Sequence, residues 1–394
     1  MGILSNSLNL LSKSISKFSP LSLSANFRSK NPFSSSLLMS SLVTLPTPFG
    51  QTQTSLHSVL RDIKSHNNKI KKLLVVRQHS GSTVYSRLSI DQNLPHNNDL
   101  YFTFSRDNQF FFPVASCNSL LLSYIDSDDH VALWNPTTDE IKSLPKPTVS
   151  GLPSEISTYI SPYGFGYDRE SQDYKVIRFV QPDRYKVDEH EGCTVPWTEY
   201  IVELYSLKTD SWKVIPYPDL GRPVQSYSIH INGFYYWLAA GPTDFILSFE
   251  FANEKFSSVP LPKTDTLSDD NLNIRFAEYD GSLALLVFGL DHDNLSIEKS
   301  PLVLEIWVWY KKSWSRVSGI IDHAPDVAVD MPLGLFNNDQ LYLKGLKSGE
   351  VLVFDCSKRE LKSFGLNSDP WHEVFILPYV ESEEPIPALP EDQV

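Results

Sequence analysis

The feature that most constrains the fold is a fifteen-residue pattern that occurs five times in the sequence of 394 residues. Each copy holds a short apolar run with an aromatic residue at position four, then a polar segment, then a second apolar run from position eleven. The five copies align without a gap, and they are Val131–Pro145, Val202–Pro216, Ile246–Pro260, Leu304–Ser318 and Val351–Gly365. Self-similarity of this kind indicates one structural unit that recurs along the chain.

Within each copy the pattern predicts a β-hairpin, with one strand before the polar turn and one after it. A single hairpin is only marginally stable in water, so each unit must bury its aromatic face against its neighbours. We therefore expect the aromatic residues of the pattern to lie between units, and these are Trp134, Tyr205, Trp212, Phe249, Phe256, Trp307, Trp314 and Phe354.

The spacing of the copies favours a ring of blades. Their starts lie 71, 44, 58 and 47 residues apart, and further strand-like runs suggest three to four strands per unit. A period near fifty is typical of kelch-like propellers. The runs 72–78, 83–90 and 100–104 have no copy of their own, and we predict that they combine with Val374–Val380 into one blade. The predicted fold is an all-β, kelch-like β-propeller over residues 69–382, with five recognisable blades and a composite sixth. Two β-sandwich domains are the alternative, but a sandwich gives no reason for five copies in phase.

Composition narrows the partners. The formal net charge is −13, which argues against binding to nucleic acid or to an anionic membrane surface. Three cysteines cannot build a disulfide framework, which favours a reducing compartment such as the cytoplasm or nucleus. No apolar run approaches the roughly 18 residues of a membrane helix.

Residues 1–50 have a different composition, with fourteen serines and no acidic residue. Three interpretations stay open: a disordered tail, an organelle transit peptide that would imply a plastid location, or a decayed domain. We expect residues 51–68 to form a short helix or linker and residues 383–394 an acidic, Pro-rich tail.

The sequence gives little support for catalysis, and we expect no enzyme activity and neither a cofactor nor a metal ion. The ten histidines include no pair at metal-ligand spacing, and Cys117, Cys193 and Cys356 lie far apart. The string Gly164-Phe165-Gly166 lacks the third glycine of a dinucleotide-binding loop, so we interpret it as a turn that leads into a strand.

Eight short strings, in order, carry a resemblance to a known family. They are Ser116–Leu121, Leu133–Thr138 (LWNPTT), Tyr163–Asp168 (YGFGYD), Asp173–Arg178 (DYKVIR), Val202–Trp212, Asn232–Ala239, Leu247–Phe251 and Glu305–Val308. Over roughly residues 70–380 the chain resembles the F-box-associated domain of plant F-box/kelch-type proteins. It departs from the usual strings at Ser119, where the family has Gly, and at Tyr236, where it has His.

The resemblance implies a protein-interaction module that recognises an unidentified target protein for an SCF-type E3 ubiquitin ligase. Such proteins carry an F-box ahead of the propeller, which docks the cullin-ligase adaptor. Here only Asn26–Phe33 matches the end of that pattern, so we expect the adaptor to bind weakly. The alternatives are a propeller enzyme, glycosidase- or oxidase-like, with acidic residues in the central channel, or a plastid-targeted binding protein.

The longest polar insertion, Gln181–Glu199, is the predicted partner-binding loop. It mixes charged and aromatic residues, which is the composition of a recognition loop. The candidate contact residues are Arg184, Tyr185, Lys186, Glu189, His190 and Trp197.

Overall fold

The computed structural model describes residues 71–79, 82–89, 98–100, 112–124, 131–147, 162–180, 200–218, 220–241, 243–264, 274–290, 302–318, 329–369 and 372–387. These residues form β-strands, turns and irregular segments, and no helix occurs among them. The Ser-rich segment 1–50, the expected helix or linker at 51–68 and the predicted partner loop all lie outside the described residues.

The strands form six antiparallel sheets of four strands each, which we call blades 1 to 6. In order from the innermost to the outermost strand, they are, for blade 1, β24 (Phe375–Val380), β1 (Lys71–His79), β2 (Ser82–Ser89) and β3 (Asn98–Leu100); for blade 2, β4 (Phe112–Cys117), β5 (Leu120–Tyr124), β6 (Val131–Asn135) and β7 (Glu140–Ser143); for blade 3, β8 (Tyr163–Asp168), β9 (Asp173–Val180), β10 (Ile201–Ser206) and β11 (Ser211–Ile215); for blade 4, β12 (Arg222–Ile231), β13 (Phe234–Ala240), β14 (Phe245–Glu250) and β15 (Lys255–Pro260); for blade 5, β16 (Ile274–Tyr279), β17 (Ser282–Leu290), β18 (Leu302–Tyr310) and β19 (Ser313–Ser318); and for blade 6, β20 (Val329–Phe336), β21 (Gln340–Gly345), β22 (Glu350–Asp355) and β23 (Glu360–Asn367).

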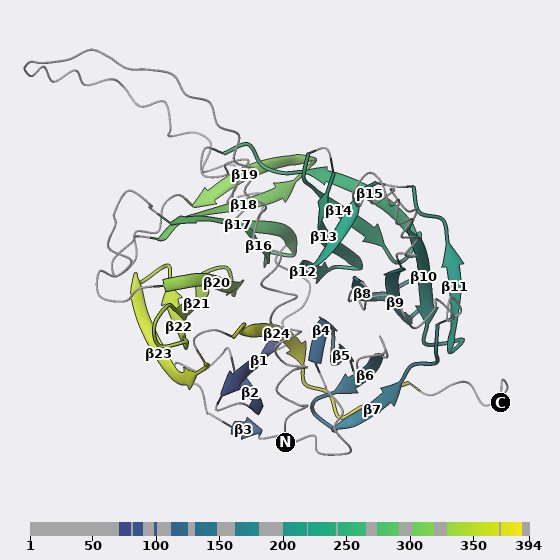
Figure 1. Ribbon diagram of the computed structural model, residues 1–394, viewed down its shortest axis with the longest axis horizontal. Coiled ribbons are helices and arrows are strands. Elements are labelled where there is room, and N and C mark those ends of the chain that lie inside the picture. Colours follow the sequence, from purple (N-terminus) through teal and green to yellow (C-terminus); the bar gives the residue numbers. More distant parts are fainter. Residues whose placement is uncertain are drawn as a thin grey trace, which may run out of the picture. The chain divides into compact units, whose positions relative to one another are not determined.

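The six blades close into a ring (Figure 1). The innermost strands contact one another in the cyclic order β4, β8, β12, β16, β20 and β24. Blade 1 joins the two ends of the propeller, because β24 pairs with β1 in a register that places Lys71 opposite Val380 and Leu74 opposite Leu377. The predicted all-β propeller with a composite sixth blade is therefore confirmed.

In four of the five repeated windows the hairpin has one common register. Position four pairs directly with position eleven, as in Trp134 with Ile141 and Tyr205 with Trp212. Position nine of each window has a positive φ of 48° to 59°, the left-handed conformation that turns the chain back. Asn or Asp often takes this conformation, and Asp139 and Asp210 are two of the four residues here.

The fourth window departs from this register. Lys311 and Lys312 both have positive φ, and they form a two-residue turn of the kind that suits a twisted hairpin. As a result Trp309 pairs with Trp314, and Trp307 pairs with Arg316. The alignment that placed Trp307 opposite Trp314 is therefore wrong by two residues, because the turn is shorter than in the other windows.

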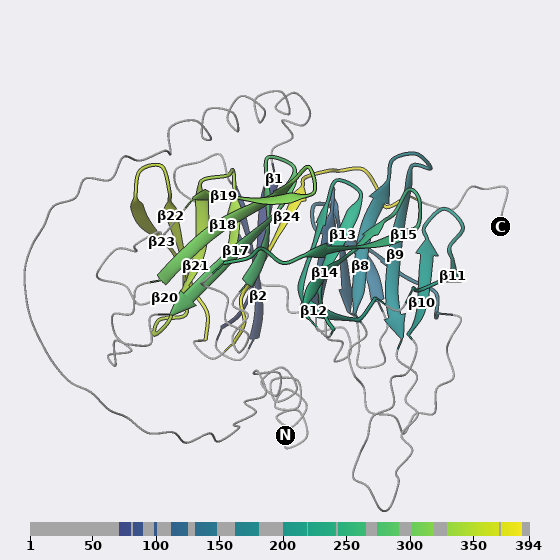
Figure 2. The same ribbon diagram turned by 90° about the horizontal axis from the view of Figure 1, so that it is seen from above.

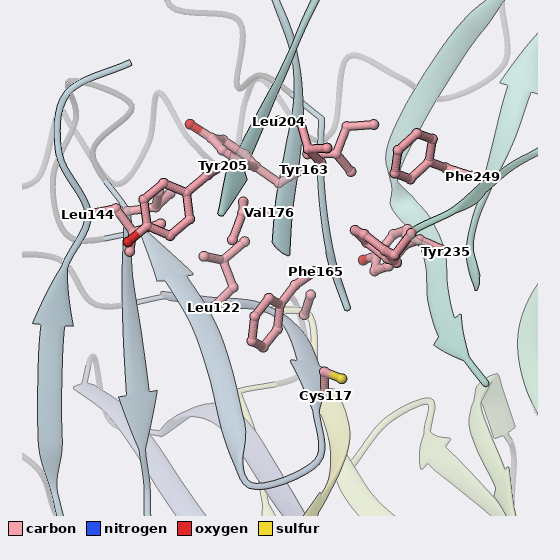
Figure 3. Packing of buried hydrophobic residues seen from close by; sticks show 14 of the residues in the cluster. Cys117, Leu122, Leu144, Tyr163, Phe165, Val176, Leu204, Tyr205, Tyr235 and Phe249 are labelled. Carbon is pink, nitrogen blue, oxygen red and sulfur yellow. The ribbon is translucent and has the colours of Figure 1, made fainter. Parts of the chain in front are cut away.

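The core lies between the blades (Figure 3). Five of the eight repeat aromatics are buried, and they are Trp134, Tyr205, Trp212, Phe249 and Phe354. The other three, Phe256, Trp307 and Trp314, are half-buried and pack on the edges of the core clusters. One cluster joins side chains of blades 2, 3 and 4, so the aromatic positions of successive repeats form one continuous packing layer.

Tryptophans at position eleven also connect neighbouring blades through hydrogen bonds. The Nε1 of Trp212 in blade 3 donates to the carbonyl oxygen of Pro145 after blade 2 (2.8 Å). The Nε1 of Trp314 in blade 5 donates in the same way to Pro260 of blade 4 (2.6 Å). Both prolines occupy position fifteen of the preceding window, so the repeat encodes a contact between blades as well as a hairpin.

Gly164 and Gly166 lie within β8, the innermost strand of blade 3, so the predicted turn at this place is wrong. The two glycines leave room for aromatic rings of blade 4. A Cβ atom at Gly166 would lie 2.1 Å from the ring of Phe251, and one at Gly164 would lie 2.5 Å from Trp237. The Trp237 Nε1 also donates to the Tyr163 carbonyl oxygen (3.0 Å), which fixes the indole over the strand.

Candidate target-binding face

The topology of the ring separates two faces. The turns that join the first strand of a blade to the second, and the third to the fourth, are short and lie at one end of the sheets, which we call the turn face. In Figure 2 the turn between β22 and β23 lies along the upper edge. The longer connections, such as β7–β8, β9–β10, β15–β16, β17–β18 and β19–β20, begin and end at the opposite end, which we call the loop face.

The predicted partner loop starts and finishes on the loop face. Val180 at the end of β9 pairs directly with Ile201 at the start of β10. The intervening segment is thus an insertion at the tip of a regular hairpin of blade 3. Its six candidate residues, Arg184, Tyr185, Lys186, Glu189, His190 and Trp197, lie outside the described residues, and their role stays a prediction.

A cluster of aromatic side chains supports the base of this insertion. Phe179, directly before the end of β9, contacts the rings of Tyr200 (6.1 Å between centroids), Tyr217 (5.5 Å) and Trp237 (5.3 Å). Tyr217 also packs on Phe256 (5.1 Å) and donates its hydroxyl to the Gly221 carbonyl oxygen (2.6 Å). Edge-to-face contacts of this kind stabilise beyond the apolar area that they bury. The stems of the insertion are therefore held by rings from blades 3 and 4.

Sequence reasoning missed Phe179, Tyr200 and Tyr217 because they lie outside the repeated windows. The available indication was their position: each stands within two residues of a strand end on the loop face. An aromatic residue at both ends of a long polar insertion is a pattern that could have been recognised.

An ion pair is buried beneath the same end of blade 3. Arg178 donates its Nε to the Oε2 of Glu203 (2.8 Å), its direct cross-strand neighbour, and its guanidinium lies 5.9 Å from the centre of the Trp212 ring. Glu203 is fully buried and Arg178 is 6% exposed. Removing one member of such a pair leaves a buried charge without its partner, so the pair ties β9 to β10.

Glu305 occupies the equivalent window position in blade 5. Its carboxylate accepts hydrogen bonds from Thr264 Oγ1 (2.6 Å), Trp307 Nε1 (2.8 Å) and Arg316 (3.1 Å). Burial acts to raise the pKa of Glu305, but these donors outweigh it and lower the pKa below its usual value. Glu203 and Glu305 thus bind donors of the fold itself, which is the arrangement of structural carboxylates.

Among the described residues no group of three His, Cys, Asp or Glu side chains could hold a metal ion. Cys117 lies 3.9 Å from the Nε2 of His230, and burial raises the pKa of its thiol far above the usual value. Burial likewise raises the pKa of Cys356 to about 11. Both thiols are protonated near neutral pH, so neither is a ready nucleophile. None of the described segments forms a helix that is long and apolar enough to cross a membrane.

The turn face is closed by hydrogen bonds between neighbouring blades. Asn118 donates to the Tyr174 hydroxyl (3.2 Å) and Asn232 donates to the Gly281 carbonyl oxygen (2.7 Å). The backbone amide of Asp280 donates to Asn338 (3.0 Å). These turns contact each other, and they hold the inner strands together at this end of the ring.

Comparison with known proteins agrees with this geometry. Residues 73–377 match the family described as the F-box associated beta propeller domain. The chain is 32% identical to F-box protein CPR1 of Arabidopsis thaliana over 280 residues, which are 64% of this chain and 62% of that protein. It is 28% identical to F-box/WD-40 repeat-containing protein 1 of the same plant over 224 residues, or 53% of this chain and 48% of the relative. A chain of a nidogen/laminin complex superposes with a TM-score of 0.43 at 10% identity, covering 79% of this chain and 99% of that one.

The family match spans well over half of the sequence, and the fold is the one that the family name describes. This protein is a six-bladed β-propeller, and it belongs to the F-box-associated β-propeller family. In these matches it spans less than two thirds of the length of the relatives.

Proposed function

We propose that this propeller is a protein-binding module that recognises a target protein with its loop face. The observation that carries the proposal is the topology: the long connections of the blades gather on one face, while short turns bonded to each other close the other. Loops on a rigid scaffold are where binding residues concentrate. The aromatic cluster around Phe179 supplies that scaffold beneath the insertion of blade 3.

We further propose that the target is delivered to an SCF-type E3 ubiquitin ligase, with this chain as the substrate-recognition subunit. The support is membership of the F-box-associated family together with relatives that are named F-box proteins. The cytoplasm or nucleus is the proposed site of action, because the charge balance and cysteine content suit a reducing compartment. A fluorescent fusion found only in plastids would instead identify residues 1–50 as a transit peptide.

The experiment for target binding is quantitative affinity purification from plant extract with the full chain as bait. The test variant replaces Tyr185 and Trp197 of the insertion by Ala. The matched control is Val214→Ala, which changes an apolar side chain that is 57% exposed on the outer strand of the same blade. We expect target proteins to be retained by the wild type and the control and reduced at least fivefold with the test variant.

If the test variant retains the same proteins at the same level, the insertion is not the recognition site. If the wild type retains no protein above an empty resin, even after cross-linking and proteasome inhibition, the protein-binding proposal fails. Both readings require that the variants elute as folded chains with the unfolding temperature of the wild type.

A further inference from the structure

The chain continues beyond β24 as an extended segment, residues 381–387, which we call the tail. It leaves blade 1 at the turn face and runs outward along blade 2, as the yellow trace in Figure 1 shows. The crossing starts at Val380, whose amide donates to the Asn118 carbonyl oxygen of blade 2 (2.8 Å). The tail thus passes over the seam where the two ends of the ring meet.

The tail binds the turn between β6 and β7, the Asn135-Pro136-Thr137-Thr138 string of the sequence motif. Asn135 is fully buried, and its Nδ2 donates to two tail carbonyl oxygens, those of Ser382 and Glu384, at 3.0 Å each. The Ser382 amide donates to Thr137 Oγ1 (3.3 Å). The side chains of this turn therefore read the backbone of an extended peptide.

A single apolar side chain anchors the far end of the tail. Ile386 is 4% exposed and belongs to the same core cluster as Leu133 and Leu144 of blade 2. Its amide donates to Glu140 Oε2 (2.7 Å). The residues around it, Pro385 and Pro387, are exposed. Backbone hydrogen bonds combined with one buried side chain are how extended peptides are recognised on protein surfaces.

We propose that the Asn135–Glu140 turn is a peptide-binding site, that the tail is its resident ligand, and that an extended acidic segment with Ile at the anchor position can replace the tail. The site lies on the turn face, so it goes beyond target recognition by the loop face. Attachment within one chain raises the effective concentration of the tail, so the site is filled unless the tail is released. When the tail is bound it staples blade 1 to blade 2 in addition to the β24–β1 pairing.

The first test uses Asn135→Asp in the full chain. Asp keeps the side-chain oxygen that accepts the Thr137 amide (2.9 Å), so the turn itself persists. It loses the Nδ2 donor and places a carboxylate against two carbonyl oxygens. We expect hydrogen exchange at the Ser382 and Ile386 amides to accelerate at least tenfold, with exchange in blades 3 to 5 unchanged. Glu383→Gln, which changes an exposed side chain between the two contacts, is the control and should match the wild type.

The second test asks whether the site accepts a peptide from outside. Ile386→Asp should release the tail, and a fluorescein-labelled peptide of residues 381–387 should then bind the variant at least tenfold more tightly than the wild type in fluorescence polarisation. The same peptide with Asp at the anchor position should bind neither protein. Equal peptide binding to wild type and Ile386→Asp, or no binding to the folded variant, would overturn the proposal of an exchangeable site. If Ile386→Asp does not fold, Ile386→Ala replaces it, and unchanged exchange in Asn135→Asp would overturn the proposal by itself.

Discussion

At the scale of single residues, the strings that this chain shares with its family have separate physical roles. The glycines of β8 make room for rings of the next blade, and Asn135 binds the tail. Asp168 and Lys175 pair within the buried rim between blades 3 and 4, where the Lys175 Nζ lies 3.0 Å from Asp168 and 3.1 Å from Glu254. The strings are thus contacts between blades, which explains why they fall outside the repeated hairpin pattern.

Replacing Gly166 by Ala should destabilise the propeller. The new methyl group would overlap the Phe251 ring, and overpacking of this kind costs about 1–3 kcal/mol. Chemical denaturation monitored by tryptophan fluorescence measures the change in the free energy of unfolding. The second variant, Gly166→Ala with Phe251→Leu, tests the cause: it should be less destabilised than the sum of the two single changes. Additive losses would show that the ring contact is not responsible.

The second residue-scale prediction concerns pH. Burial acts to raise the pKa of Asp168, but hydrogen bonds from Ser171 (2.6 Å) and Lys175 outweigh it and lower the pKa to about 2 from 3.8. The stabilisation from ionised Asp168 is therefore present above about pH 4 and is lost as the pH falls toward 2. Asp168→Asn should lower the free energy of unfolding at pH 7, and its difference from wild type should shrink over that acidic range. A difference that stays constant from pH 7 to pH 2 would contradict the assignment.

At the scale of elements, the hairpins could be predicted from the sequence, and the register of one of them could not. Alternating apolar residues around polar segments are a local pattern, so they revealed the strands of the repeated windows and even the split of blade 1. The fourth hairpin shifts by two residues because Lys311 and Lys312 close a shorter turn, and two lysines carry no strong preference for that conformation. The roles of Phe179 and Gly166 depend on which blade lies beside them, which no local pattern contains.

Trp212 should show how much the contact between outer strands of neighbouring blades contributes. Trp212→Ala removes the buried ring that packs on Tyr205 at 5.3 Å, and it should lower the free energy of unfolding by about 3–5 kcal/mol. Trp212→Phe keeps much of the packing and loses the hydrogen bond to Pro145, a loss of about 1 kcal/mol for the bond itself. Trp314→Ala, at the half-buried equivalent in blade 5, should cost less than Trp212→Ala. Equal losses at the two sites would show that burial does not set the contribution.

At the scale of the whole molecule, the closed ring accounts for its own ends. β1 has strand partners on both sides, β24 and β2, so the described ring needs no residue before Lys71 to complete a sheet. A chain of residues 68–394 should therefore unfold in a single cooperative transition within a few degrees of the full chain. Differential scanning calorimetry measures both. A broad or absent transition in the shortened chain would show that residues 1–67 contribute to the fold.

The last prediction concerns the ligase adaptor and follows from residues 1–67 alone. Docking with useful affinity requires each partner to bury about 800 Å², which a helical module supplies with a continuous apolar surface. Residues 1–50 scatter serines among their Leu and Phe side chains, and Ser favours caps and turns over helix interiors. Pro20 and Pro32 flank the stretch that resembles the end of an F-box, and each would end or kink a helix. We therefore expect purified adaptor to bind the full chain no more than a few-fold better than residues 68–394 in a pull-down, with F-box protein CPR1 as the positive control. Tight binding that requires residues 1–67 would contradict this expectation, and it would show that a docking module exists in a sequence that hides it.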